Sequence, residues 1–323
     1  MTNPKHIASQ VEKSWDAYWH GTAESGAYSS GGAGHPAIKD FWGTFFQSMK
    51  KDHTMPSILD IASGNGAVVE HALQVFGEGL AEISCVDISE SAVANIQNRF
   101  PRVNGIVADA RSIPLETGAV DIITSQFGVE YAGLEAVDEA ERLLAVGGQL
   151  AFILHIQAGS IHQECARNLD AISRVQESRF IEYAIEMFRT GFEAVHGADR
   201  APYDQAGKQL APALKTLEGI MEQYGEHVAD DTIVRLYSDV GDIHSEIQHY
   251  DPVEILSWLS RMGEELDTYA GRMSSMHDAA LDEDRFERIC NGLRSREFTI
   301  ESAGPFMVPD SESPLAWALV ARR

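Results

Sequence analysis

The stretch ILDIASGNGAVVEHAL, residues 58–73, constrains the fold more than any other part of the chain. Residues 57–61 are mostly apolar and β-branched, which predicts a buried strand. Residues 62–66 predict a tight loop, because glycine permits positive φ and lets a ligand approach the backbone closely. From residue 67 to residue 76 the apolar side chains recur at helical spacing. This order opens a nucleotide-binding unit, with an ordinary strand-to-helix turn as the alternative.

The same alternation of strand and helix continues along the chain. We expect further strands at residues 81–86, 103–107, 120–124 and 149–155. A helix is expected after the N-cap Ser89 up to Arg99, and a second at 134–145, ended by Gly147 and Gly148. Strands and helices that alternate at these spacings predict a parallel sheet covered on both faces.

The pattern changes in the second half of the chain. Residues 157–291 show no convincing strand, and stretches such as RFIEYAIEMFRTGFEAV have helical spacing. Residues 161–290 hold 26 Asp or Glu against 12 Lys or Arg, which is most of the excess negative charge. The chain then ends in two strand-like stretches, EFTIESAGPFMVP and PLAWALVARR. They predict a hairpin that adds an antiparallel strand to the sheet, so the helical segment is an insertion.

Charge and cysteine content exclude several functions. The chain has 323 residues and a formal net charge of −24, which disfavours nucleic acid as a partner. Neither a membrane-spanning apolar run nor a signal-peptide core is present, so we expect a cytoplasmic protein with no membrane partner. Cys85, Cys165 and Cys290 lie far apart, which indicates neither a metal site nor a disulfide framework.

The first 55 residues form a segment of their own. Residues 5–19 have a helical pattern, and a glycine- and serine-rich loop follows that carries Trp19, Tyr28 and His35. Exposed aromatic side chains are costly, so this segment is expected to pack over something. Two interpretations stay open: packing on the body of the domain, and a lid over a ligand site.

Taken together, four motifs resemble those of class I S-adenosylmethionine-dependent methyltransferases, in particular the group with the quinone-biosynthesis C-methyltransferases. LDIASGNG resembles the first motif, and CVDIS resembles the second strand with its ribose-binding acid. VADARSIPLETGAVDII and LLAVGGQLAFIL resemble the third to fifth strands, and the final hairpin resembles the last two. The resemblance covers residues 56–156 and 296–323.

The resemblance implies a fold class and a division into domains. The fold is α/β: a Rossmann-like, seven-stranded, mostly parallel sheet with a C-terminal antiparallel hairpin strand, plus an all-helical insertion before the last two strands. Residues 1–55 are an N-terminal helical segment and possible lid. Residues 56–156 and 292–323 are the core that binds S-adenosylmethionine, and residues 157–291 are the acceptor-binding insertion.

The resemblance also implies cofactor contacts for the first motif. Asp60 and the backbone from Ala62 to Gly66 would lie against the methionine part of S-adenosylmethionine, with Asp60 accepting from the ammonium group. Ala62 departs from the family, which has glycine there. Because Gly64 and Gly66 keep the close approach, we interpret Ala62 as a tolerated variant.

The strand ends imply the remaining cofactor contacts. Asp87 would accept from both ribose hydroxyls, and Ile88 would pack on the adenine. Asp109 would accept from the exocyclic amine while the Ala110 N–H donates to a ring nitrogen. For both aspartates, a helix cap or turn residue is the alternative. The side that faces the methyl group would be lined by Gln126 and Phe127.

Candidate catalytic residues lie where ligands bind in open α/β sheets, beyond the carboxyl ends of the strands. His155 ends the fifth strand and is the best placed base; a hydrogen-bonded structural histidine is the alternative. Glu130 and Tyr131 follow the fourth strand. Tyr28 and His35 are expected to close over the acceptor. A base is needed only if the acceptor must lose a proton.

A dehydrogenase is the main rival among nucleotide-binding folds. Its Gly-x-Gly-x-x-Gly fingerprint, started at Gly64, places Val69 where the third glycine is needed, so the pattern fails. Among methyltransferases we expect a small-molecule acceptor, and a homodimer is a compatible assembly. Methylation of a protein or peptide, and a regulator that binds the cofactor without catalysis, are the alternatives.

Overall fold

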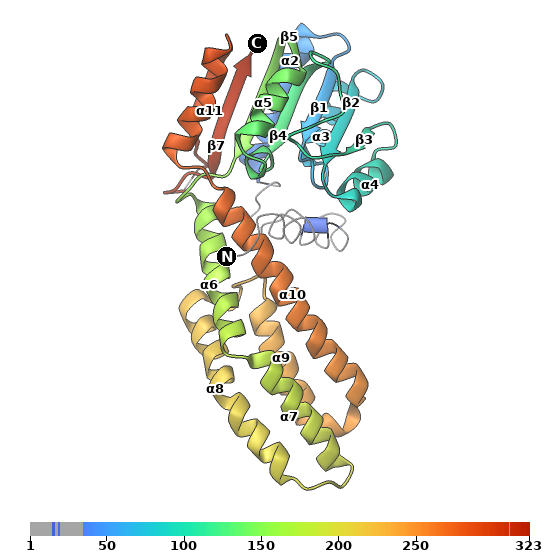
Figure 1. Ribbon diagram of the computed structural model, residues 1–323, viewed down its shortest axis with the longest axis vertical. Coiled ribbons are helices and arrows are strands. Elements are labelled where there is room, and N and C mark those ends of the chain that lie inside the picture. The colour runs from blue at the N-terminus through green and yellow to red at the C-terminus, as the bar shows by residue number, and fades with distance from the viewer. Residues whose placement is uncertain (1–14, 17–18, 20–34, 310) are drawn as a thin grey trace. The chain divides into compact units, whose positions relative to one another are not determined.

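The structure of the protein, a computed structural model, describes residues 15, 16, 19, 35–309 and 311–323 (Figure 1). It divides into two compact units. The sheet unit comprises Met1–Gln163 and Ser275–Arg323, and the helical unit comprises Glu164–Ser274. Each unit is described by itself.

The sheet unit is built on one seven-stranded sheet. Its strands are β1 (Ser57–Ile61), β2 (Glu82–Asp87), β3 (Asn104–Val107), β4 (Val120–Gln126), β5 (Leu144–Leu154), β6 (Thr299–Phe306) and β7 (Ala316–Arg322). Their order is β3-β2-β1-β4-β5-β7-β6. The pairs from β3 to β5 are parallel, and β7 runs antiparallel to both β5 and β6. The predicted mostly parallel sheet with a reversed strand in a C-terminal hairpin is confirmed.

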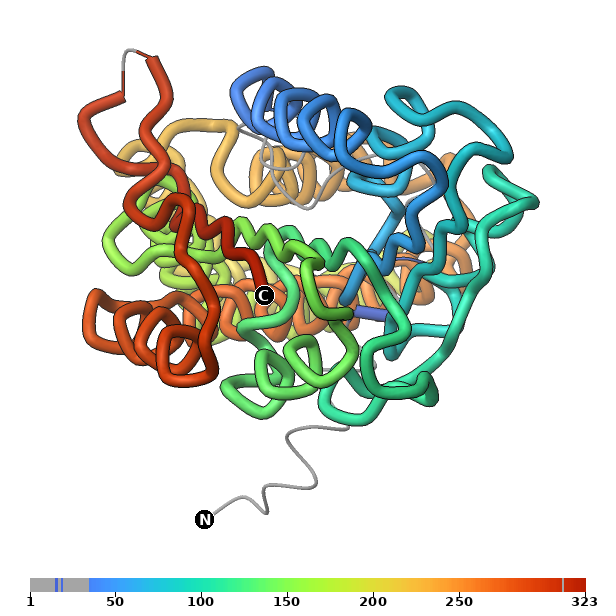
Figure 2. The backbone as a smooth tube through the Cα atoms, turned by 90° about the horizontal axis from the view of Figure 1, so that it is seen from above, coloured from blue at the N-terminus to red at the C-terminus, as the bar shows by residue number. Residues whose placement is uncertain are grey.

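Helices cover both faces of this sheet. They are α2 (Pro36–Asp52), α3 (Ala67–Phe76), α4 (Glu90–Arg99), α5 (Leu134–Leu143) and α11 (Glu283–Ser295). Viewed along the sheet, α2 lies on one side, and α5 and α11 lie on the other (Figure 2). One buried cluster joins apolar side chains of α5 and α11 to those of the central strands. Burial of these faces is the main driving force for this arrangement.

One predicted helix end is wrong. The helix expected to run to residue 145 ends at Leu143, and Gly147 and Gly148 lie inside β5 instead of capping it. Leu144 already has extended backbone and pairs with Val120 of β4. The Gly147 N–H donates to the carbonyl of Arg323 at 3.0 Å, so these glycines continue the strand beside the C-terminus.

The sheet unit also includes more of the second half of the chain than the predicted insertion boundary allows. The Phe286 ring in α11 stacks on Trp317 of β7 with ring centroids 4.2 Å apart. Ile289, Cys290 and Leu293 are buried in the same cluster. The apolar face of α11 therefore packs on the sheet, and the helical unit is shorter than residues 157–291.

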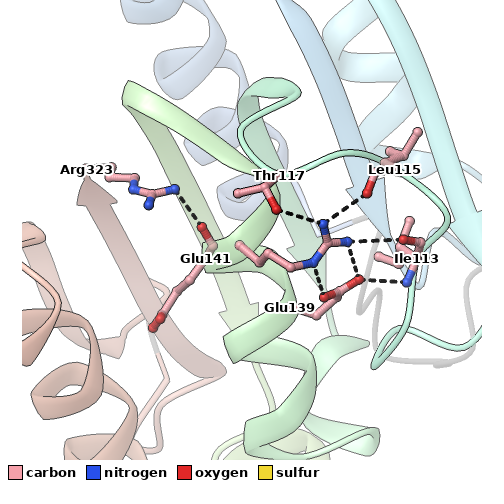
Figure 3. A network of polar contacts seen from close by, with 7 residues as sticks. Ile113, Leu115, Thr117, Glu139, Glu141 and Arg323 are labelled. Atoms are coloured by element: carbon pink, nitrogen blue, oxygen red, sulfur yellow. Dashed lines mark hydrogen bonds and ion pairs between the residues drawn. The ribbon is translucent and has the colours of Figure 1, made fainter.

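Arg142 of α5 holds the loop between β3 and β4 in place. Figure 3 shows this network of polar contacts, with Ile113, Leu115 and Thr117 of the loop labelled. The Arg142 guanidinium donates to the carbonyls of Leu115 at 3.0 Å and Ile113 at 3.2 Å. Glu139 accepts from the same guanidinium and from the Ile113 N–H at 2.8 Å. This network fixes the loop of residues 108–119, which has no regular secondary structure and which carries Asp109.

The helical unit confirms the predicted all-helical segment. It contains α7 (Phe180–Val195), α8 (Ala201–Tyr224), α9 (Thr232–Ser245), the short helix η2 (Ile247–His249) and most of α6 (Ser160–Glu177) and α10 (Pro252–Ala279). Its apolar core includes Phe180, Phe188, Leu217, Ile220, Ile233 and Leu236. Within the described part of the chain, no helix has the length and apolar character needed to cross a bilayer.

Candidate functional site

The loop between β1 and α3 turns through left-handed backbone. Ala62, Gly64 and Gly66 have φ of 54°, 52° and 79°. Gly66 stands at the N-cap of α3, and the Ser63 N–H donates to the carbonyl of Val86 in β2 at 3.1 Å. Neither Gly64 nor Gly66 has room for a side chain: a Cβ built at Gly66 would lie 2.9 Å from Cγ1 of Ile96, and Gly64 lies close to the Trp19 ring.

Ala62 takes the left-handed conformation that its glycine counterpart would adopt without strain. A Cβ built at Gly128 would lie 2.5 Å from the Cβ of Ala62 and 3.0 Å from its carbonyl oxygen. The absence of a side chain at Gly128 therefore makes room for the methyl group of Ala62. No sequence motif indicated Gly128, because its role depends on contact between two segments that are 66 residues apart.

Asp87 joins the glycine loop to the end of β2. One carboxylate oxygen accepts from the Gly64 N–H at 2.9 Å, and the other accepts from the Ser89 N–H at 3.0 Å. The side chain is buried, and burial raises the pKa of Asp87, which these backbone N–H groups partly counter. The next residue, Ile88, is 45% exposed, so an apolar surface lies beside a carboxylate.

Asp60 is buried in β1, 2% exposed, and accepts from the Thr124 hydroxyl at 2.8 Å. Burial raises the pKa of Asp60 to about 7, despite the hydrogen bonds from Thr124 and Ser63, which lower it. A buried carboxyl that titrates near neutral pH is poised to ionise when a cation arrives.

Asp109 has a different environment from the other two aspartates. Its carboxylate accepts a bidentate contact from Arg111, with Nε at 2.9 and 3.0 Å from the two oxygens. The hydrogen bonds from Arg111 hold the pKa of Asp109 below its ordinary value. A ligand amine at this position has to share the carboxylate with Arg111. Ala110 is partly buried against the core cluster.

Gln126 is the last residue of β4, and Phe127 follows it. The Gln126 side-chain oxygen accepts from the indole N–H of Trp42 in α2. Phe127 has φ of 52°, a strained conformation that is found in many functional sites. Its ring lies against the ring of His155, with centroids 4.6 Å apart.

His155 lies at the end of β5 and is 1% exposed. Its ring Nδ1 lies 2.6 Å from Oε1 of Glu130, which is also buried. His35, by contrast, caps α2, where its Nδ1 accepts from the Ala37 N–H at 3.2 Å. Tyr28 lies outside the described residues. The catalytic roles of His155, His35 and Tyr28 stay predictions.

The described residues that precede His35 are Trp15, Asp16 and Trp19, and all of them contact the site. Asp16 accepts from the Ser89 hydroxyl at 2.6 Å and from the Ser91 N–H at 3.3 Å, next to Asp87. The Trp15 ring meets Tyr131 edge to face, with centroids 5.8 Å apart. The aromatic residues of this segment predicted that it packs over another part of the protein, but no sequence pattern indicated Asp16.

Trp19 lies over the glycine loop itself. Its backbone carbonyl accepts from the Asn95 side chain at 2.8 Å, and its side chain is 9% exposed. A Cβ built at Gly64 would lie 2.7 Å from ring carbon Cζ2 of Trp19. The indole therefore contacts the backbone that the motif leaves bare.

Sequence comparisons find relatives for one part of the chain. Residues 58–148 match a family described as a methyltransferase domain. An uncharacterized methyltransferase of Schizosaccharomyces pombe is 29% identical over 135 residues, which cover 41% of this chain and 52% of that protein. The ubiquinone/menaquinone biosynthesis C-methyltransferase UbiE of Campylobacter jejuni is 31% identical over 111 residues, which cover 32% and 46%. The chain thus spans about half the length of these curated relatives.

Solved structures are more distant in sequence. The plantazolicin methyltransferase BpumL, solved with a pentazolic desmethylPZN analog and S-adenosylhomocysteine, aligns over 99% of this chain and 97% of its own, with 12% identity and a TM-score of 0.48. A methyltransferase from Aquifex aeolicus aligns over 34% of this chain and 63% of its own, with 21% identity and a TM-score of 0.30.

Substitution of Gly128 tests the contact with Ala62. We expect Gly128→Ala to lower the free energy of unfolding by about 1–3 kcal/mol, because the new methyl group overpacks the loop. Adding Ala62→Gly removes the 2.5 Å contact and restores part of the loss, while the contact with the carbonyl of residue 62 remains. Urea unfolding of both single variants and the double variant measures this coupling.

Gly43→Ala is the matched control, since this glycine lies in α2 with nothing within 4 Å of an added Cβ. It should stabilise the protein by about 0.5–1 kcal/mol through helix propensity. A Gly128→Ala variant as stable as the parent would contradict the packing argument.

Asp60→Asn tests the buried carboxyl. Unfolded Asp60 titrates near 3.8 and the folded form near 7, so between these values the folded state holds a proton that the unfolded state has released. The free energy of unfolding of the parent therefore falls through this pH range. The Asn variant lacks this loss, so above about pH 4 its free energy of unfolding should rise relative to that of the parent, by about 1–4 kcal/mol at pH 8, and its Tm should rise with it.

Asp109→Asn supplies a control of opposite sign. The pKa of Asp109 is lowered by Arg111, so its charged form stabilises the fold above its ordinary pKa, and this contribution is lost on acidification. This variant should be less stable than the parent at neutral pH and converge with it in acid. Parallel Tm curves for parent and Asp60→Asn from pH 4 to pH 8 would overturn the assignment.

Proposed function

Because the chain carries a class I S-adenosylmethionine-dependent methyltransferase domain, we propose that it transfers the methyl group of this cofactor to a small-molecule acceptor. The family membership predicted from the motifs is confirmed. The observation that carries the proposal is the hydrogen bond from the Gly64 N–H to Asp87. This bond places the glycine loop next to a carboxylate at the end of a strand. A nucleoside with a charged tail needs both: the carboxylate for its ribose and the loop for its tail.

The residues around this bond fit S-adenosylmethionine. The Asp87 carboxylate has lone pairs beyond those that the two backbone N–H groups use, and these can accept from ribose hydroxyls. Ile88 offers an exposed apolar side chain for the adenine. Asp60 offers a carboxyl that ionises in favour of the ammonium group. When bound, the cofactor supplies an electrophilic methyl group on a sulfonium.

The chain's own contribution is to position the reactants and to exclude water. Methyl transfer is an in-line displacement, so the rate depends on how well the acceptor is held against the methyl group. Trp15 and Trp19 cover the glycine loop and the turn after β4, which supports a lid that limits water near the reaction. A covered site suits a small acceptor better than a polypeptide. Binding of the acceptor by the inserted helices stays a prediction.

Asp87→Ala tests the cofactor site. We expect S-adenosylhomocysteine to bind the parent protein with micromolar affinity. The variant should lose about 2–4 kcal/mol of this binding free energy, because the charge-assisted hydrogen bonds to the ligand are absent. Isothermal titration calorimetry measures both. The matched control is Asp121→Ala, whose carboxylate also accepts a backbone N–H, from Ser57 at 2.9 Å, but at the amino end of β4. It should retain affinity.

Titration of the parent protein with NAD separates the two nucleotide classes. Heat from S-adenosylhomocysteine and none from NAD is the expected pair of results. Tight binding of NAD with no binding of S-adenosylhomocysteine would refute the proposal.

Trp19 can be used to test whether the N-terminal segment is a lid. Since its indole contacts Gly64, a ligand at the glycine loop has to move it or cover it, and S-adenosylhomocysteine should change the tryptophan fluorescence. Trp19→Phe should lose most of this change. Trp258→Phe, in α10 within the helical unit, should keep it. If Trp19→Phe responds like the parent, the segment is only packed on the domain.

A further inference from the structure

Glu130 and His155 form a buried pair at the carboxyl ends of neighbouring strands. Glu130 lies in the short helix η1 (Val129–Tyr131) after β4, and His155 follows β5. The side chains are 0% and 1% exposed. A carboxylate this far from water is costly unless its partners compensate.

A single carboxylate oxygen of Glu130 contacts two nitrogens of His155. Oε1 lies 2.8 Å from the backbone N–H of His155 and 2.6 Å from Nδ1 of its ring. The backbone N–H is always a donor, and an ionised carboxylate only accepts. With the Glu130 carboxylate ionised, the ring donates from Nδ1, and Nε2 is then the nitrogen that can accept a proton. This is the opposite of the tautomer that a free imidazole prefers in water.

Aromatic neighbours fix the plane of the ring. Phe127 lies against it with centroids 4.6 Å apart, and Tyr131 meets it edge to face at 5.6 Å. The second oxygen of Glu130, Oε2, is buried and has no hydrogen-bond partner among the described residues. Such a loss of hydration is costly and calls for a functional reason.

Resting on the proposed function, we infer that Glu130 is a positioning residue that sets the tautomer of His155 as the general base. The acceptor is then of the class that must lose a proton, a hydroxyl or an acidic carbon. For a hydroxyl, the acceptor oxygen bonds to the methyl carbon and its proton passes to Nε2. Sulfur keeps the electron pair of the broken carbon–sulfur bond. Glu130 stabilises the imidazolium until its proton leaves to solvent.

The tautomer is read by NMR of protein with 15N-labelled histidine, with no cofactor present. The His155 signals are those lost in His155→Gln. We expect a protonated Nδ1 and an unprotonated Nε2 in the parent. Glu130→Gln should keep this pattern, because the amide oxygen can accept from both donors. Glu130→Ala should revert to a protonated Nε2.

Glu141→Gln is the control, since Glu141 is an equally buried carboxylate that pairs with Arg296 and lies in α5. It should leave the His155 signals unchanged. A protonated Nε2 in the parent overturns the inference without any variant, so it stays testable even if Glu130→Ala does not fold. An Nδ1–H tautomer that survives Glu130→Ala overturns it as well.

Turnover tests the acceptor class, with methyl-labelled S-adenosylmethionine and catechol, benzyl mercaptan and benzylamine as probes. We expect label on catechol, and a fall in kcat of about 10²–10⁴-fold in Glu130→Ala and His155→Gln with unchanged affinity for S-adenosylhomocysteine. Label on the thiol or the amine but not on catechol overturns the inference. Failure of the parent to bind S-adenosylhomocysteine instead overturns the proposed function, and the NMR result stands apart from it.

Discussion

The hydrogen bond between the Gly64 N–H and Asp87 connects the two elements on which the site depends. The glycine loop follows β1, and Asp87 ends β2, which lies beside β1 in the sheet. Parallel pairing brings both to the same edge, and this bond then fixes the loop to the carboxylate. The backbone of this loop has positive φ, which glycine adopts readily at positions 64 and 66. Ala62 also has positive φ, and its methyl group fits because Gly128 beside it has no side chain.

Three aspartates at this edge differ in electrostatics because their surroundings differ. Asp60 and Asp87 are buried, which raises the pKa of each, whereas Arg111 lowers the pKa of Asp109. A cationic cofactor tail and two ribose hydroxyls would relieve the first two. The same residue type therefore has a raised or a lowered pKa, depending on burial and on the charges around it.

The N-terminal segment and the Glu130–His155 pair extend the site beyond the cofactor motifs. Trp19 covers Gly64, and Trp15 contacts Tyr131, whose ring also meets His155. Trp15 also stacks on Trp19, with ring centroids 6.0 Å apart, so a row of aromatic rings runs from the glycine loop to His155. In the proposed mechanism, the same rings would exclude water from the displacement and hold the ring of His155 in place.

The sequence alone determined the architecture, because strand and helix periodicity, the glycine loop and the closing hairpin are local patterns. It also located Asp87, since that residue follows a recognisable strand. It misjudged the end of α5, because Gly147 and Gly148 serve a strand that pairs with the C-terminus. Only the tertiary structure showed the contacts of Gly128, Asp16 and Glu130. Their partners lie on distant segments, and contact between segments is set by packing, which no local spacing encodes.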